Sequence, residues 1–112
     1  MTTLIAHEHG TLYIMDEHGT PRPCSCPLEW ARWMATNKPI VQMDVIHEDV
    51  AVITLFMGIS CQTPPEVFAT KIIARPGSWA ERFMGCYGRS VTRVEALRTH
   101  RAAIMSVSYA LG

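Results

Sequence analysis

The feature that most constrains the fold is residues 50–59, VAVITLFMGI, a run in which only Thr54 and Gly58 are not apolar. A strand with one side in water alternates apolar and polar residues, so this run predicts a central strand covered on both faces. The chain has 112 residues, and few of them remain to build two covers. We therefore expect a homodimer, or a partner protein, to cover one face of the sheet that contains this strand.

Four further segments predict the remaining strands. Residues 40–46 and 67–74 are rich in β-branched and aromatic residues, and residues 11–16 and 82–87 are shorter candidates. Short turn segments separate neighbouring strands, which favours antiparallel pairing. Residues 40–46 also alternate apolar and polar residues, which predicts a strand buried on its apolar side only.

Two segments predict helices. Pro27 suits the first position of a helix, and the pattern after it ends near Asn37. Thr92 and Glu95 have the spacing of a capping box, which predicts a second helix that continues to about Tyr109. The expected fold class is therefore α+β, a three- to four-stranded antiparallel sheet with two helices packed on one face. We expect one domain, residues 1–112, with residues 1–10 as a candidate flexible arm.

Charge is distributed unevenly along a chain whose formal net charge is zero. Residues 1–70 contain three basic and eight acidic side chains, whereas residues 71–112 contain seven basic and two acidic ones. Two outcomes are compatible with this asymmetry: folding mixes the two halves into a neutral surface, or the acidic surface of one subunit meets the basic surface of another.

The sequence predicts a cytoplasmic protein. The first ten residues lack the basic start and apolar core of a signal peptide. No run approaches the roughly 18–20 apolar residues that cross a bilayer, so we expect no membrane contact. The four cysteines should then be free thiols.

Candidate metal ligands cluster near the N-terminus. His7 and His9 are two residues apart, and Cys24 and Cys26 form a C-x-C motif. Together they are a candidate zinc site, although paired cysteines in zinc sites are usually separated by two to four residues. The alternative interpretation is two ordinary thiols and an unrelated pair of histidines.

A second chemical hypothesis pairs Cys61 with His100, because an imidazole can activate a thiolate. His100 falls on the apolar stripe of the last helix. The favoured interpretation is therefore a core histidine bonded to a backbone carbonyl.

Three further side chains are candidates for interaction, together with Cys61. Trp33 lies three residues after Trp30 on the first helix, so only one of the two rings can point fully inward. Arg98 and Arg101 lie on the side of the last helix opposite its apolar stripe. They suit carboxylates or phosphates. Nucleic acid is an unfavoured partner, because the chain is neutral overall and has no recognisable nucleic-acid-binding module.

Several segments together resemble a family of small uncharacterised proteins of tailed phages and prophages. The resemblance rests on VITLFMGI, on the Pro-Pro-Glu-Val-Phe-Ala-Thr segment, on Thr-Arg-Val-Glu-Ala, and on the later His100. Upstream, Tyr-Ile-Met-Asp and Leu-Glu-Trp-Ala-Arg-Trp-Met are also similar to that family, so most of residues 12–107 are covered. The chain departs from the pattern at Ser60-Cys61, where the family has Asp-His, and at Ala69 and Thr99.

The resemblance implies a non-enzymatic phage accessory protein that acts by binding a host protein or its own copies. Small phage proteins of this kind include inhibitors of bacterial defence systems, such as anti-CRISPR proteins. We assign this functional class to the chain by analogy. Two alternatives stay open: a metal- or thiol-dependent enzyme or metal-binding module, and a protein that sequesters a nucleotide with its arginines.

Overall fold

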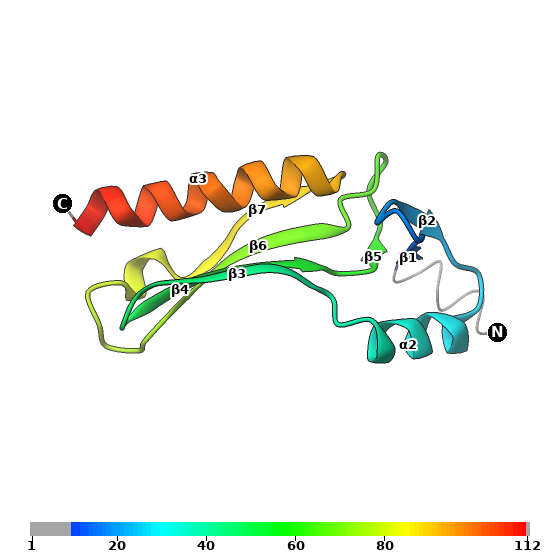
Figure 1. Ribbon diagram of the computed structural model, residues 1–112, viewed down its shortest axis with the longest axis horizontal. Coiled ribbons are helices and arrows are strands. Elements are labelled where there is room, and N and C mark those ends of the chain that lie inside the picture. The colour runs from blue at the N-terminus through cyan, green and yellow to red at the C-terminus, as the bar shows by residue number, and fades with distance from the viewer. Residues whose placement is uncertain (1–9, 112) are drawn as a thin grey trace.

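The predicted central strand lies inside a four-stranded antiparallel sheet of order β3-β4-β6-β7 (Figure 1). The computed structural model describes residues 10–111. The strands of this sheet are β3 (Ile40–His47), β4 (Val50–Phe56), β6 (Phe68–Ala74) and β7 (Gly85–Ser90). The short 3-10 helix η1 (Glu81–Phe83) lies between β6 and β7. The α+β class and the antiparallel sheet are thus confirmed.

A second, smaller sheet lies beyond one end of the first. Its order is β2-β1-β5, and its strands are β1 (Thr11–Met15), β2 (Pro21–Pro23) and β5 (Ile59–Ser60). Helix α2 (Pro27–Thr36) packs against β1. The sequence predicted one sheet only, because a strand of two residues such as β5 leaves no periodic signal.

Helix α3 (Arg93–Leu111) lies along one face of the four-stranded sheet. Thr92 caps its first turn: the Glu95 amide donates to the Thr92 hydroxyl at 3.1 Å, and that hydroxyl is 3.1 Å from the Glu95 carboxylate. The helix buries a narrow stripe of small or medium side chains against the sheet: Ala96, His100, Ala103 and Val107. Because three of these residues are small, the helix lies close to the strands.

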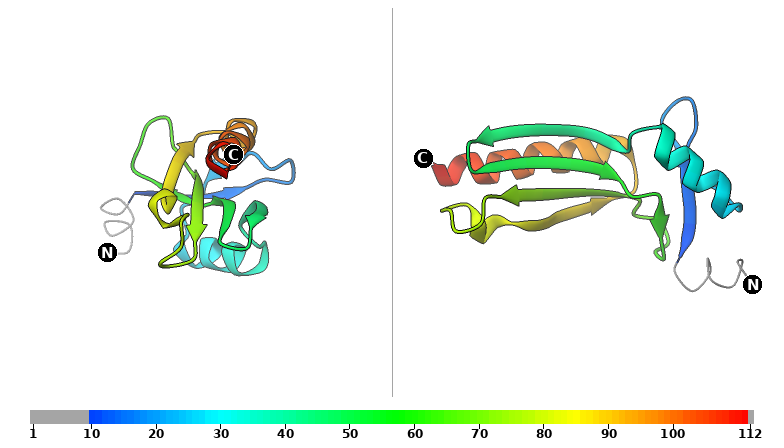
Figure 2. Two further views of the ribbon diagram at one scale, coloured as in Figure 1. Left: turned by 90° about the vertical axis from the view of Figure 1, so that its left-hand side faces the viewer. Right: turned by 90° about the horizontal axis from the view of Figure 1, so that it is seen from below.

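The position of α2 refines the expectation that both helices pack on one face of one sheet. In Figure 2, α2 lies beyond the end of the four-stranded sheet, whereas α3 runs along that sheet. The link between α2 and the sheet is aromatic: the Trp33 ring meets Phe56 edge-on at a centroid distance of 5.5 Å. Trp33 is therefore partly committed to packing inside the chain.

The junction between the two sheets is built around Gly58. Its carbonyl accepts from the Tyr13 amide at 2.8 Å and from Trp30 Nε1 at 2.9 Å, so β1 and α2 both attach there. Gly58 has a φ of 70°, a conformation that costs a residue with a Cβ about 1–2 kcal/mol. A Cβ added at Gly58 would also lie 2.8 Å from Trp30 Nε1 and 3.1 Å from the Tyr13 carbonyl oxygen. Glycine is therefore required at this position for conformation and for space.

We expect Gly58→Ala to destabilise the protein more than Gly77→Ala does. Gly77 has a similar φ of 78° but no atom within 4 Å of an added Cβ, so its substitution isolates the conformational cost. The additional loss at Gly58 should be about 1–3 kcal/mol, the cost of overpacking a close contact. Urea unfolding of both variants measures the difference, and equal losses would show that the junction tolerates the methyl group.

Candidate functional site

A chain of polar side chains crosses the interface between α3 and the sheet. The Thr70 and Thr54 hydroxyls are 2.7 Å apart, and Thr54 Oγ1 is 2.7 Å from His100 Nδ1. On the other side of the ring, His100 Nε2 is 2.7 Å from Asp44 Oδ2 on β3. Thr54, Thr70 and His100 are at most 1% exposed, so three polar residues occupy the centre of this interface.

Elementary hydrogen-bond chemistry gives this chain a direction. An ionised carboxylate only accepts, so His100 Nε2 donates to Asp44. In the neutral imidazole, His100 Nδ1 then accepts the Thr54 hydroxyl proton, which leaves the Thr54 oxygen to accept from Thr70. Every buried polar side-chain atom among residues 10–111 has a hydrogen-bond partner. A fully satisfied network of this kind stabilises one packing arrangement of helix on sheet.

The order carboxylate, imidazole, hydroxyl matches that of a hydrolase triad, but Thr54 cannot act as a nucleophile here. Its side chain is 0% exposed, and its oxygen already contacts both Thr70 and His100. A nucleophile must lie within reach of a substrate carbonyl, which this buried position prevents. The chemical role of the network is therefore to attach α3 and the edge strand β3 to the central strands.

Asp44 is the one member of the network that reaches solvent, with a side chain 41% exposed. The Gln42 side-chain amide donates to its Oδ2 at 2.8 Å, and His100 donates to the same atom. The bond from Gln42, followed by that from His100, lowers the pKa of the Asp44 carboxyl below its usual value. The carboxylate is thus held ionised at the end of the buried chain.

His100 is buried, as the favoured interpretation expected, and it does not form the alternative thiolate pair with Cys61. Both imidazole nitrogens of His100 bond to Thr54 and Asp44, so neither is left to activate a thiol. The expected backbone carbonyl partner is also wrong, because the partners are side chains. Cys61 is exposed beside Ser60, Glu66 and Arg89 in a shallow hollow at the loop before β6. No role for this thiol follows from those neighbours.

The proposed zinc ligands are only partly described. His7 and His9 lie outside the described residues, as does the rest of the predicted arm before Gly10. Cys24 is buried and its thiol points at the Cys26 carbonyl oxygen, at 3.5 Å, whereas Cys26 is exposed at the start of α2. The zinc site stays a prediction, and elemental analysis of the purified protein tests it.

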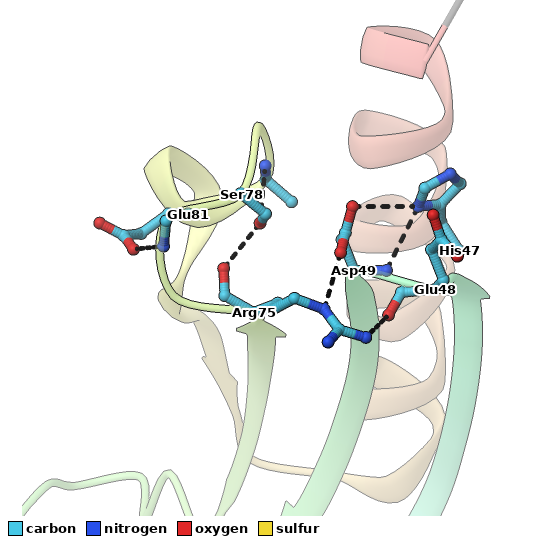
Figure 3. A network of polar contacts seen from close by, with 8 residues as sticks. His47, Glu48, Asp49, Arg75, Ser78 and Glu81 are labelled. Carbon is cyan, nitrogen blue, oxygen red and sulfur yellow. Dashed lines mark hydrogen bonds and ion pairs between the residues drawn. The ribbon is translucent and has the colours of Figure 1, made fainter.

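A different group of potential ligands lies at the β3–β4 turn, where the sequence indicated only a turn. His47, Glu48 and Asp49 place one ligand atom each within 4.8 Å of one another. Figure 3 shows that two of these groups already have partners: the Asp49 amide donates to His47 Nδ1 at 3.2 Å, and Arg75 Nε donates to Asp49 Oδ1 at 2.8 Å. Arg75 also donates to the Glu48 carbonyl at 3.1 Å, so these contacts attach the turn to the end of β6.

Arg98 and Arg101 are exposed on the outer side of α3, as the helical pattern predicted. They line a shallow groove with Val94, Leu97 and Met105. This groove faces away from the buried network.

The opposite face of the four-stranded sheet is not covered by a helix in the described part of the chain. Seen from below in Figure 2, the strands lie in front of α3, and no helix crosses them. We call this surface the open face and define it by side chains of β3, β4 and β6 that point away from α3: Ile40, Met43, Val45, Ala51, Ile53, Leu55, Lys71 and Ile73. Lys71 is the only charged residue among them.

Strand β3 is inverted relative to the expectation from its alternation. Met43 and Val45, predicted to face the core, are 56% and 74% exposed, whereas Asp44 points toward α3 and His100. The alternation itself is correct, but period-two patterning gives two faces without saying which one is buried. The buried Nε2 of His100 needs a hydrogen-bond acceptor, and the Asp44 carboxylate is that acceptor. Asp44 must therefore point toward α3, and its neighbours Met43 and Val45 must point away from α3.

Comparison with known proteins gave no match to any family model, curated protein sequence or solved structure. In the part of the chain that the structure describes, none of the helices has the length and apolarity needed to cross a membrane.

We expect stability to fall in acid partly through Asp44. Its pKa is lower in the folded than in the unfolded chain, so the unfolded state takes up the proton first. The contribution is therefore fully present above the unfolded value of about 4 and is lost as pH falls through the folded value. Asp44→Asn should reduce the fall in unfolding free energy between about pH 5 and pH 2, measured by urea titrations at several pH values.

Asp16 provides the matched comparison. Backbone amides, first that of Thr20, lower the pKa of its carboxyl in the β1–β2 turn. Asp16 and Asp44 share no partner, so the effects of the two Asn variants should add in the double variant. An acid profile of Asp44→Asn that coincides with that of the unsubstituted protein would contradict the role of the network.

Proposed function

We propose that this protein is a non-enzymatic accessory protein of a tailed phage or prophage that acts by binding another protein through its open face. The observation that carries the proposal is that the apolar side of the amphipathic strand β3, with Met43 and Val45, faces away from α3 and is exposed. Apolar side chains with that much exposure are unfavourable in water, and grouped together they mark interaction surfaces.

Burial of the exposed apolar side chains of the open face would provide free energy for binding. Burying a Val, Ile or Met side chain contributes about 1.5–3 kcal/mol relative to leaving it exposed. Val45, Met43 and Ile73 are each about half exposed or more, and they lie in one surface, on the two strands that flank β4. A partner that covers all three recovers much of this free energy, which is the main driving force of protein association.

The size of the surface favours a weak or transient partner. Three strands spaced by about 4.8 Å, each about seven residues long at about 3.3 Å per residue, give a footprint on the order of 300 Å². Side-chain relief makes the accessible area larger than this footprint. Both sides together then bury on the order of 700 Å², which is the size of a weak or transient interface.

The phage assignment is supported by the sequence resemblance, and the host partner class follows from it by analogy. Small phage proteins of this kind include inhibitors of bacterial defence, so a component of such a defence system is the partner class that we propose. The open face would act by occupying a surface that such a component uses, which requires binding alone and no chemical step.

We expect Val45→Glu to abolish capture of the partner from a bacterial lysate, because a carboxylate at the most exposed apolar position of the open face would have to be buried without a counter-ion. Met105→Glu is the matched control: Met105 is 64% exposed, but it lies on the outer side of α3. Quantitative mass spectrometry of proteins captured by the three baits measures the difference.

A bound protein retained by Met105→Glu and lost by Val45→Glu supports the proposal. Circular dichroism and urea unfolding of each bait check that the substitutions leave the fold intact. A captured protein lost with Met105→Glu and retained with Val45→Glu would instead place binding on α3 and overturn the role of the open face.

A further inference from the structure

We infer that the free edge of β3 binds an extended segment of the partner protein as an added strand. This inference rests on the proposed function, because the added strand is the part of the bound protein that lies beside the open face. It specifies the conformation of that segment and its chemistry: apolar side chains level with the open face, and a cation opposite Asp44.

Strand β3 forms one long edge of the four-stranded sheet (Figure 2). Among residues 10–111, β4 is the only strand that pairs with it. The main-chain N–H and C=O groups of successive residues in a paired strand point alternately to its two sides. Alternate residues of β3 therefore direct both groups away from β4. An edge of this kind can pair with an extended segment of another protein.

The other edge strand, β7, is a poorer template for pairing. Two of its six residues are glycine, and the register with β6 shifts between Cys86 and Gly88. Such irregularities bend an edge strand and interrupt its ladder. The register of β3 also shifts near both of its ends, but between them the run Gln42–Val45 pairs residue by residue with β4. This regular run is the part of β3 with which the added strand would pair.

One side of the added strand lies level with the open face. Met43 and Val45 of the regular run are 56% and 74% exposed there. Side chains at paired positions of neighbouring strands lie about 4.5–5.5 Å apart, so apolar residues on this side of the added strand would contact both of them. The open face alone gives a weak interface, and the added strand supplements it with directional main-chain hydrogen bonds.

The other side of the added strand meets Asp44. The Oδ2 atom of Asp44 accepts from Gln42 and His100, whereas Oδ1 has no hydrogen-bond donor within the described part of the chain. No lysine or arginine among residues 10–111 lies within ion-pair distance of this carboxylate. Because the Asp44 side chain is 41% exposed at the sheet edge, a cation opposite it can donate a charge-assisted hydrogen bond to Oδ1.

These features specify the bound segment. Its apolar residues alternate with polar ones, as on β3 itself, and the polar residue that pairs with Asp44 is lysine or arginine. A carboxylate at that position would lie beside the Asp44 carboxylate, and like charges directly opposite each other destabilise a strand pair. The edge therefore selects against acidic segments as well as in favour of basic ones.

A fluorescein-labelled peptide of nine residues tests this chemistry. It has lysine at its centre, threonine at the other odd positions and valine at the even positions, so that lysine and valine lie on opposite sides of a strand. We expect its fluorescence anisotropy to rise as the purified chain is added up to about 1 mM, the weak end of the affinity scale. A matched peptide with glutamate at the centre should bind about 10-fold more weakly.

Asp44→Asn tests the position of the cation. It should reduce the preference for the lysine peptide over the glutamate peptide from about 10-fold to about 2-fold or less, because the charge opposite the central residue is removed. Comparing two peptides on one variant separates this effect from a general loss of stability, which weakens both equally. Asp16→Asn, in the β1–β2 turn, is the matched control and should keep the full preference.

Two N-methylated forms of the lysine peptide test the strand pairing itself on the unsubstituted chain. One form is methylated at the odd positions and the other at the even positions, so each lacks the N–H donors of one side of a strand. Only one of these sides can face β3. We expect one form to bind about 10-fold or more weakly than the unmethylated peptide, through its lost main-chain hydrogen bonds, and the other form to keep its affinity.

Four results would overturn the inference. These are no binding of the lysine peptide at the highest chain concentration, equal effects of the two methylation patterns, and an unchanged lysine preference in Asp44→Asn. The fourth is occupation of the edge by a second copy of the chain, which sedimentation velocity would detect as a dimer that excess lysine peptide does not dissociate.

The outcomes for the β3 edge and for the proposed function are separable. If the peptide does not bind but a captured protein is lost with Val45→Glu, strand addition is disproved and the open face remains a binding surface. If the peptides bind as expected but no captured protein depends on Val45, the edge of β3 binds extended segments and the action of the open face on a cellular protein is disproved.

Discussion

The contact on which the structure depends is the hydrogen-bonded chain from Thr70 through Thr54 and His100 to Asp44. An imidazole on the buried stripe of α3 requires polar partners on both sides, because an unpaired buried nitrogen is costly. Thr54 supplies one partner from the central strand, and Asp44 supplies the other from the edge strand. The helix is thereby fixed on the side of the sheet where these residues point.

The uncovered apolar surface is a consequence of this contact. Once Asp44 points toward α3, its neighbours Met43 and Val45 must point away, since successive side chains of a strand lie on opposite faces. The sheet then has one face packed against α3 and one apolar face without a cover (Figure 2). The structural role of His100 and the proposed binding role of the open face are therefore two results of one arrangement.

Much of the fold could be predicted because its signals are local. The central strand, its antiparallel neighbours and the capping box at Thr92 each depend on residues close in sequence. The small sheet could not be predicted, since β5 has two residues and attaches through Gly58, whose requirement is a close approach of Trp30 and Tyr13 from distant segments. The contact of Arg75 with Asp49 could not be predicted for the same reason, because it joins the β3–β4 turn to the end of β6, 26 residues away.

The sequence by itself determined that the central strand is apolar on both sides. It also determined that β3 has one apolar and one polar side. Only the tertiary structure decided which side of β3 faces α3, because that choice depends on a hydrogen bond between Asp44 and His100, 56 residues apart. A pattern of period two specifies faces, and the partner across the core specifies which of them is buried.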